Sequence, residues 1–127
     1  MYEFEKLGIW QRSLDLIDEI YGIIKSIPRD DRLGLGGQIG RAALSISLNI
    51  AEGKGSGSDR EFRRFLIMSR RSVFELVAAL KVGLRLGMLK DSDCKCALDR
   101  CDEVGAKINK LISKLGAPGE RQKANSK

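Results

Sequence analysis

A cluster of basic residues in the middle of this sequence is the feature most suited to binding a ligand. Residues 54–90 contain nine basic and three acidic side chains, whereas residues 1–53 contain six and eight, and residues 91–127 contain eight and six. A charge excess confined to one segment favours an anionic partner over general solubility. The basic residues that we select as candidates for nucleic-acid binding are Lys54, Arg60, Arg63, Arg64, Arg70, Arg71, Lys81 and Arg85.

Seven of these residues, from Arg60 to Arg85, fall within an arc of about 120° if the segment is helical. Six of the seven are arginines, which grip phosphate oxygens with a planar fork and stack on bases, whereas lysine acts mainly as a point charge. Ile67 and Phe74 lie in the same arc and could stack on unpaired bases or pack against another subunit. The alternative, an ordinary solvent-exposed basic face, stays open.

Other kinds of site are poorly supported by the residue types. The sequence has no histidine, which excludes His-dependent hydrolases and His-ligated zinc. On a helix, the side chains of Cys94 and Cys96 point about 160° apart, and Cys101 lies about 10 Å from Cys94 along the helix axis. The three therefore cannot share a metal ion. Cys94 and Cys101 are expected to be buried and Cys96 exposed. The glycine-rich run 53–57 lacks the upstream glycine and preceding strand of a phosphate-binding loop. We expect no cofactor, no metal and no enzymatic activity.

The elements that would position these residues are four helices. The first is predicted over Phe4–Ser26, stopped by Pro28, and the second from Leu33 or Leu35 to Glu52. A capping box, Ser58 with Glu61, predicts the start of the third helix, which reaches Leu86 with Gly87 as its left-handed stop. The fourth is capped by Asp91 or Ser92 and extends to residue 115. Bundle-type apolar spacing predicts an antiparallel up-down-up-down four-helix bundle over residues 1–119, followed by a polar tail, 120–127, that need not be ordered.

The first helix carries two apolar lines about 120° apart. The line with the spacing of a bundle seam consists of Leu7, Trp10, Leu14, Ile17, Tyr21 and Ile24. The other consists of Ile9, Leu16, Ile20, Ile23 and Ile27. In the second helix, Leu44, Leu48 and Ala51 lie opposite the expected core line. These surplus apolar faces predict contact with another subunit.

A polar line on the second helix contains Arg41, Ser45, Asn49 and Glu52 on successive turns. We interpret it as a hydrogen-bonded and ion-paired seam that fixes helix register, in preference to a surface that contacts a ligand. Neither a signal peptide nor an apolar run long enough to span a membrane is present, so we expect a cytoplasmic protein with no membrane partner and with reduced thiols.

The central block of the chain resembles a known family. Residues Gln38-Ile39-Gly40-Arg41-Ala42-Ala43-Leu44-Ser45-Ile46 continue with Asn49-Ile50-Ala51-Glu52-Gly53, and shorter matches extend over residues 4–90. The pattern is similar to that of the four-helix-bundle proteins encoded within intervening sequences of bacterial 23S ribosomal RNA genes. The residues of the polar seam that carry the family signature are Gln38, Arg41, Ser45, Asn49 and Glu52.

The resemblance implies a homo-oligomer, a pentameric barrel. It also implies kinship with the accessory variability determinants of diversity-generating retroelements, which bind nucleic acid and a reverse transcriptase. The family pattern has a basic residue where this chain has Gly40 and usually a small residue where it has Arg71. We therefore expect a nucleic-acid-binding accessory protein, with structured RNA favoured over DNA. The alternative is a scaffold that docks a nucleic-acid-processing protein such as a reverse transcriptase.

Overall fold

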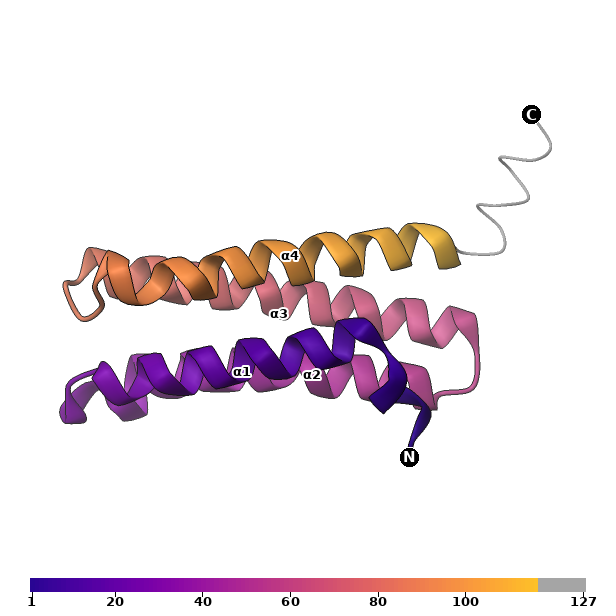
Figure 1. Cartoon of the computed structure of the whole chain (residues 1–127), viewed down its shortest axis with the longest axis horizontal. Helices are drawn as coiled ribbons and strands as arrows, with labels where there is room; N and C mark the ends of the chain where they lie inside the picture. The colour runs from indigo at the N-terminus through magenta and orange to yellow at the C-terminus, as the bar shows by residue number, and fades with distance from the viewer. Residues whose placement is uncertain (117–127) are drawn as a thin grey trace.

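The computed structural model describes residues 1–116. Within this range, four long α-helices lie side by side and alternate in direction (Figure 1). They are α1 (Gly8–Ser26), α2 (Gly37–Gly55), α3 (Asp59–Arg85) and α4 (Asp91–Leu115). Each helix packs against the next one in the chain, and α4 closes the bundle against α1. The predicted antiparallel four-helix bundle is confirmed. The predicted domain end at residue 119 and the tail 120–127 lie outside the described residues.

The boundaries of the first two helices differ from the prediction. Residues Glu3–Lys6 form a separate 3-10 turn before α1, which begins at Gly8. A π-helical turn, Arg32–Gly36, precedes α2, and α2 continues to Gly55 instead of ending at Glu52. Arg32 closes the end of α1, because its Nε donates to the carbonyl of Ile27 at 3.0 Å and its Nη2 to that of Lys25 at 3.0 Å. These bonds satisfy carbonyls that a helix end leaves without partners.

The apolar line of α1 that is buried in the core is not the one that the sequence analysis assigned to the bundle seam. Ile9, Leu16, Ile20, Ile23 and Ile27 are buried at the centre of the bundle. Of the predicted seam, Leu14 and Tyr21 are exposed and the other four residues are only half-buried. The reason is a close approach of α1 to glycines of α2. Ile24 Cδ1 lies only 3.2 Å from where a Cβ on Gly40 would be, so this line covers the α1–α2 boundary instead of facing inward.

The predicted start of α3 is confirmed and its end, Arg85, lies one residue before the predicted Leu86, but the capping at two helix starts is simpler than expected. The Ser58 hydroxyl accepts from the backbone N–H of Glu61 at 3.1 Å, and Gly87 adopts a φ of 74° after the helix. The Glu61 carboxylate turns to Arg64 instead of completing a reciprocal box. The residue that precedes α4 is Lys90, without a side-chain cap, so neither Asp91 nor Ser92 caps this helix.

Replacing Ser58 with alanine is expected to lower the free energy of unfolding by about 1 kcal/mol, since the amide of Glu61 loses its acceptor. Ser58→Asp keeps an acceptor and should stay close to wild type. Urea unfolding measures the difference. Ser113→Ala, at an exposed position of α4, is the control. Equal stability of Ser58→Ala and this control would contradict the assignment.

The cysteines are placed as the sequence predicts. Cys94 and Cys101 are buried and Cys96 is exposed, and all three are free thiols. Burial, with a smaller contribution from the Asp102 charge, raises the pKa of the Cys101 thiol from 9.0 to about 12. Burial also raises the pKa of Cys94, with help from Asp93 and Asp91. The two buried thiols therefore act as small apolar side chains of the core.

The raised pKa of Cys101 predicts a loss of stability at alkaline pH. Above pH 9.0 the unfolded chain releases this proton, while the folded chain keeps it until about pH 12. The unfolded state then binds fewer protons, so the free energy of unfolding falls as pH rises through this window. Urea unfolding at several pH values should give a smaller fall for Cys101→Ala than for the wild type. Equal slopes would contradict the expectation.

No helix within residues 1–116 combines the length and the apolar character that a membrane crossing requires.

Candidate nucleic-acid interface

The basic residues of α3 lie on the side of the helix that faces away from the core. The α3 core line is buried, including Phe62, Leu66, Val73 and Leu80. Of the seven basic residues in the arc, five are exposed and two, Arg63 and Arg70, are half-buried. The exposed ones are Arg60, Arg64, Arg71, Lys81 and Arg85. A local property, the angular position along one helix, is therefore enough to place these side chains on one surface.

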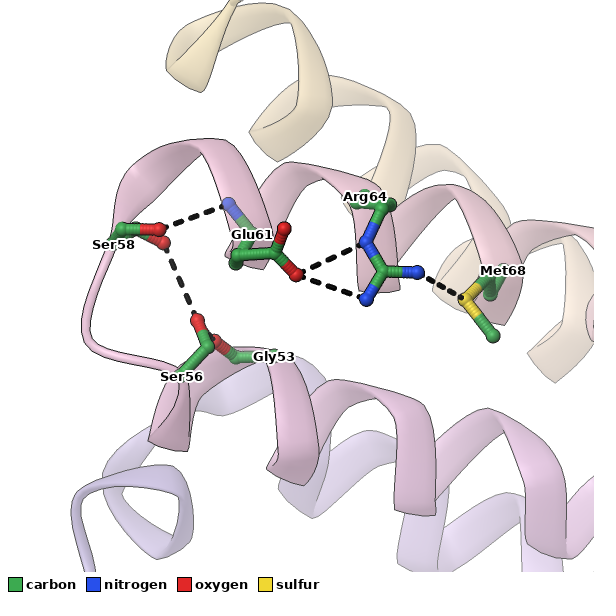
Figure 2. Close-up of polar contacts among 6 residues, drawn as sticks. All are labelled: Gly53, Ser56, Ser58, Glu61, Arg64 and Met68. Atoms are coloured by element: carbon green, nitrogen blue, oxygen red, sulfur yellow. Dashed lines mark hydrogen bonds and ion pairs between the residues drawn. The ribbon is translucent and has the colours of Figure 1, made fainter.

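Arg64 makes several contacts with its own helix (Figure 2). Its Nε and Nη2 donate to Glu61 Oε2 at 3.0 and 2.9 Å, and its Nη1 lies 3.8 Å from the sulfur of Met68. The guanidinium also lies 4.6 Å from the centre of the Phe65 ring. Because both charged side chains are exposed, the ion pair is worth only about 0.5 kcal/mol. Arg64 is thus partly neutralised, at little energetic gain.

Arg70 is held by a neutral partner on the neighbouring helix. Its Nη1 donates to Asn109 Oδ1 of α4 at 3.0 Å. An amide oxygen orients the guanidinium without cancelling its charge. Sequence reasoning missed Asn109, because it lies 39 residues away in the chain and only the register of α4 beside α3 brings it close.

Four basic residues of α3 make no ion pair with any carboxylate in residues 1–116: Arg60, Arg71, Lys81 and Arg85. Lys54 lies at the last turn of α2, with its Nζ 5.6 Å from the centre of the Phe62 ring near the start of α3. A cation over an aromatic face keeps its charge available to a second partner. The exposed face of α3 therefore carries several cationic side chains that form no ion pair within residues 1–116.

The polar line of α2 forms a hydrogen-bonded seam with α3. Gln38 donates to Glu75, and the Ser45 and Ser72 hydroxyls lie 2.8 Å apart. Within α2, Arg41 Nη2 donates to Gln38 Oε1 at 3.2 Å, and Asn49 Nδ2 donates to the carbonyl of Ser45 at 2.9 Å. These contacts agree with the interpretation as a register-fixing seam.

One residue of this line departs from the expectation. Glu52 is exposed, and no ion pair joins it to a residue in the range 1–116. The expected ion-paired end of the seam is therefore wrong for this part of the chain. Glu52 lacks such a pair because two basic residues close to it in the sequence have other partners. Lys54 lies over the Phe62 ring, and Arg64 pairs with Glu61.

Ile67 and Phe74, which share the basic arc, differ in environment. Ile67 is half-buried and packs against the core cluster, so it does not offer a free surface to a base. Phe74 is 67% exposed. Further along α3, Val82 and Leu86 are also exposed, which the sequence analysis did not single out. The available signal was that Phe74, Ala78, Val82 and Leu86 follow one another in steps of four, which stay on neighbouring turns of one face.

A family comparison decides what kind of protein carries this surface. Residues 5–110 match the family of 23S rRNA-intervening sequence proteins. The chain belongs to this family. The comparison with curated proteins found no match to this chain.

Among solved structures, the 23S rRNA-intervening sequence protein described here is similar to a protein of unknown function from the S23 ribosomal protein family of Bacteroides thetaiotaomicron. The TM-score is 0.76 at 19% sequence identity, covering 82% of this chain and 97% of the other. At this identity the likeness supports the shared fold alone.

Gly40 is one of the two positions at which the sequence analysis finds a departure from the resemblance. A Cβ at this position would lie 3.2 Å from Ile24 Cδ1. A larger side chain would therefore require Ile24 to move. Arg71, the other such position, is exposed on α3.

Proposed function

We propose that this 23S rRNA-intervening sequence protein is a non-enzymatic, self-associating protein that binds nucleic acid through the outer face of α3. The observation that carries the proposal is the group of exposed basic residues, Arg60, Arg71, Lys81 and Arg85, without a carboxylate partner in residues 1–116. Such groups gain most from phosphates, whose condensed counterions are released on binding. Structured RNA is the favoured ligand and DNA the alternative.

The test is the affinity of the protein for a structured RNA across a series from about 50 to about 300 mM salt. If several phosphates are contacted, the logarithm of the binding constant falls linearly with the logarithm of salt, by about 0.7 to 0.9 per contact. A duplex DNA of similar length measured in parallel tests the preference for RNA. An affinity that does not change with salt would contradict the proposal.

Self-association, as a pentamer in the form that the family resemblance implies, is the second part of the proposal. It is supported by apolar side chains that the single bundle leaves exposed: Leu14 and Tyr21 on α1, and Leu44 and Leu48 on α2. An assembly would multiply the net charge of +6 per chain and strengthen binding to a polyanion. Light scattering at micromolar concentration measures the mass, and a monomer would contradict this part.

The proposal places the protein in the cytoplasm, in keeping with three free thiols. A protein partner, such as a reverse transcriptase, is the alternative use of the basic face. Nuclease treatment before purification separates the two. A partner protein that remains bound after the nucleic acid is digested would favour the scaffold, and loss of the bound material would favour nucleic-acid binding.

A further inference from the structure

A groove between α3 and α4 lies directly beside the exposed ring of Phe74. The groove has a volume of about 330 Å³. It opens on the same side of the molecule as the basic face, because Arg70 and Phe74 of the α3 arc both line it. The ring of Phe74 is 67% exposed, although a phenyl ring gains free energy when it leaves water. The single bundle leaves this ring largely uncovered.

The floor of the groove is apolar and its α4 wall is low. Val73, Val77 and Cys101 line it from below, while Gly105 and Ala106 contribute the α4 side. The thiol of Cys101 is buried and makes this part of the floor uncharged and apolar. A ligand with a flat, partly apolar ring would therefore contact apolar atoms of the groove along its inner edge and the ring of Phe74 at its side.

The two ends of the groove differ in charge. Arg70 lies at one end, where its hydrogen bond to Asn109 fixes the guanidinium in place. Asp102 lies toward the other end. A ligand with a flat ring and one attached anionic group would thus bind in one direction, with the anion at Arg70. An unpaired nucleotide has this combination of a base and a phosphate.

We propose that this groove receives an unpaired base of an RNA strand, which stacks on Phe74 while its phosphate contacts Arg70. The inference rests on the proposed function and deepens it: the preferred ligand is RNA that displays single-stranded nucleotides, in a loop or at an end. Fully paired RNA would contact the same arginines through its backbone but leave the groove empty.

The experiment compares two RNAs of equal length, one with a single-stranded loop and one fully paired. Stacking of one base on an aromatic side chain is worth about 1–3 kcal/mol, so Phe74→Ala should bind the looped RNA about 5- to 160-fold more weakly. Its affinity for the paired RNA should not change. Phe74→Trp should restore binding of the looped RNA, and its added indole fluorescence should be quenched on binding. Val82→Ala, at another exposed apolar residue of α3, is the matched control.

Three results would overturn the inference, and they are distinguishable. If the wild type binds neither RNA, the proposed function fails and this inference with it. If the wild type binds both and Phe74→Ala binds the looped RNA equally well, only the base site fails. If Phe74→Ala instead lowers the mass of the protein in light scattering, the ring packs against a second copy of the chain. The base site is then excluded while the basic face remains.

Discussion

Replacing Arg60, Arg71, Lys81 and Arg85 together with alanine is expected to weaken RNA binding about a hundredfold at about 0.1 M salt. The salt dependence should flatten at the same time, by about 3 in the slope of the logarithmic plot, because each lost phosphate contact removes about 0.7 to 0.9. None of the four makes an ion pair within residues 1–116, so the fold should be unaffected. Fluorescence anisotropy of a labelled RNA measures both quantities.

The control for this variant removes the same charge from another part of the surface. Lys25, Arg29, Lys107 and Lys110 are exposed and lie on α1, on the loop after it and on α4. Their joint replacement with alanine changes the net charge equally, but should alter the affinity only slightly. If both variants lose affinity to the same extent, binding depends on total charge and the specific role of α3 is wrong.

Gly53→Ala is expected to produce the largest loss of stability of any single substitution considered, about 2–3 kcal/mol. A Cβ at this position would lie 2.7 Å from Phe65 Cβ, 3.0 Å from Phe62 Cδ1 and 3.3 Å from the Phe62 carbonyl oxygen. Because a Cβ and a carbonyl oxygen are fixed to the helix backbone, α3 would have to move away from α2. Urea unfolding with far-UV circular dichroism measures the change.

Two other glycines provide matched controls. Gly22, in the middle of α1, has no atom within 4 Å of the position of an added Cβ, so Gly22→Ala should stabilise the protein by up to about 1 kcal/mol. At Gly83 a Cβ would meet Leu89 Cδ1 at 2.6 Å, Leu89 Cγ at 3.0 Å and Leu35 Cδ2 at 3.1 Å, all of which belong to side chains and none to the backbone. Gly83→Ala should therefore cost less than Gly53→Ala. A Gly53→Ala protein as stable as the wild type would contradict the close approach.

The helices were predictable from local signals, but the inward face of α1 was not. Pro28, Ser58 and Gly87 each mark a helix end through chemistry that needs only neighbouring residues. Both apolar lines of α1, by contrast, have helical spacing, and their orientation depends on a contact with α2. Glycines at 36 and 40 leave room for Ile24, which turns one line toward α2 and the other toward the core.

The candidate site likewise combines features that local spacing predicts with features that depend on how the helices are aligned. The arc of basic residues follows from the geometry of a single helix, and the pairing of Arg64 with Glu61 is a local contact over three residues. The bond from Arg70 to Asn109 depends on how α3 and α4 are aligned, which the sequence does not specify. Ile67 is half-buried because the neighbouring packing reaches beyond the core line of α3. Long-range alignment is the physical information that periodicity lacks.

The polar contacts between α2 and α3 have a consequence for the molecule as a whole. Three of them occur at different heights: Gln38 with Glu75, Ser45 with Ser72, and the Ser69 hydroxyl with the carbonyl of Ile46 at 2.9 Å. If α3 slipped by one turn, about 5.4 Å, along α2, all three hydrogen bonds would break and the buried Ser69 hydroxyl would lose its acceptor. These contacts therefore fix the position of the α3 arginines along the bundle axis relative to Leu44 and Leu48 of α2. If identical copies assemble symmetrically through that apolar side, each copy would therefore present its guanidinium groups at the same height.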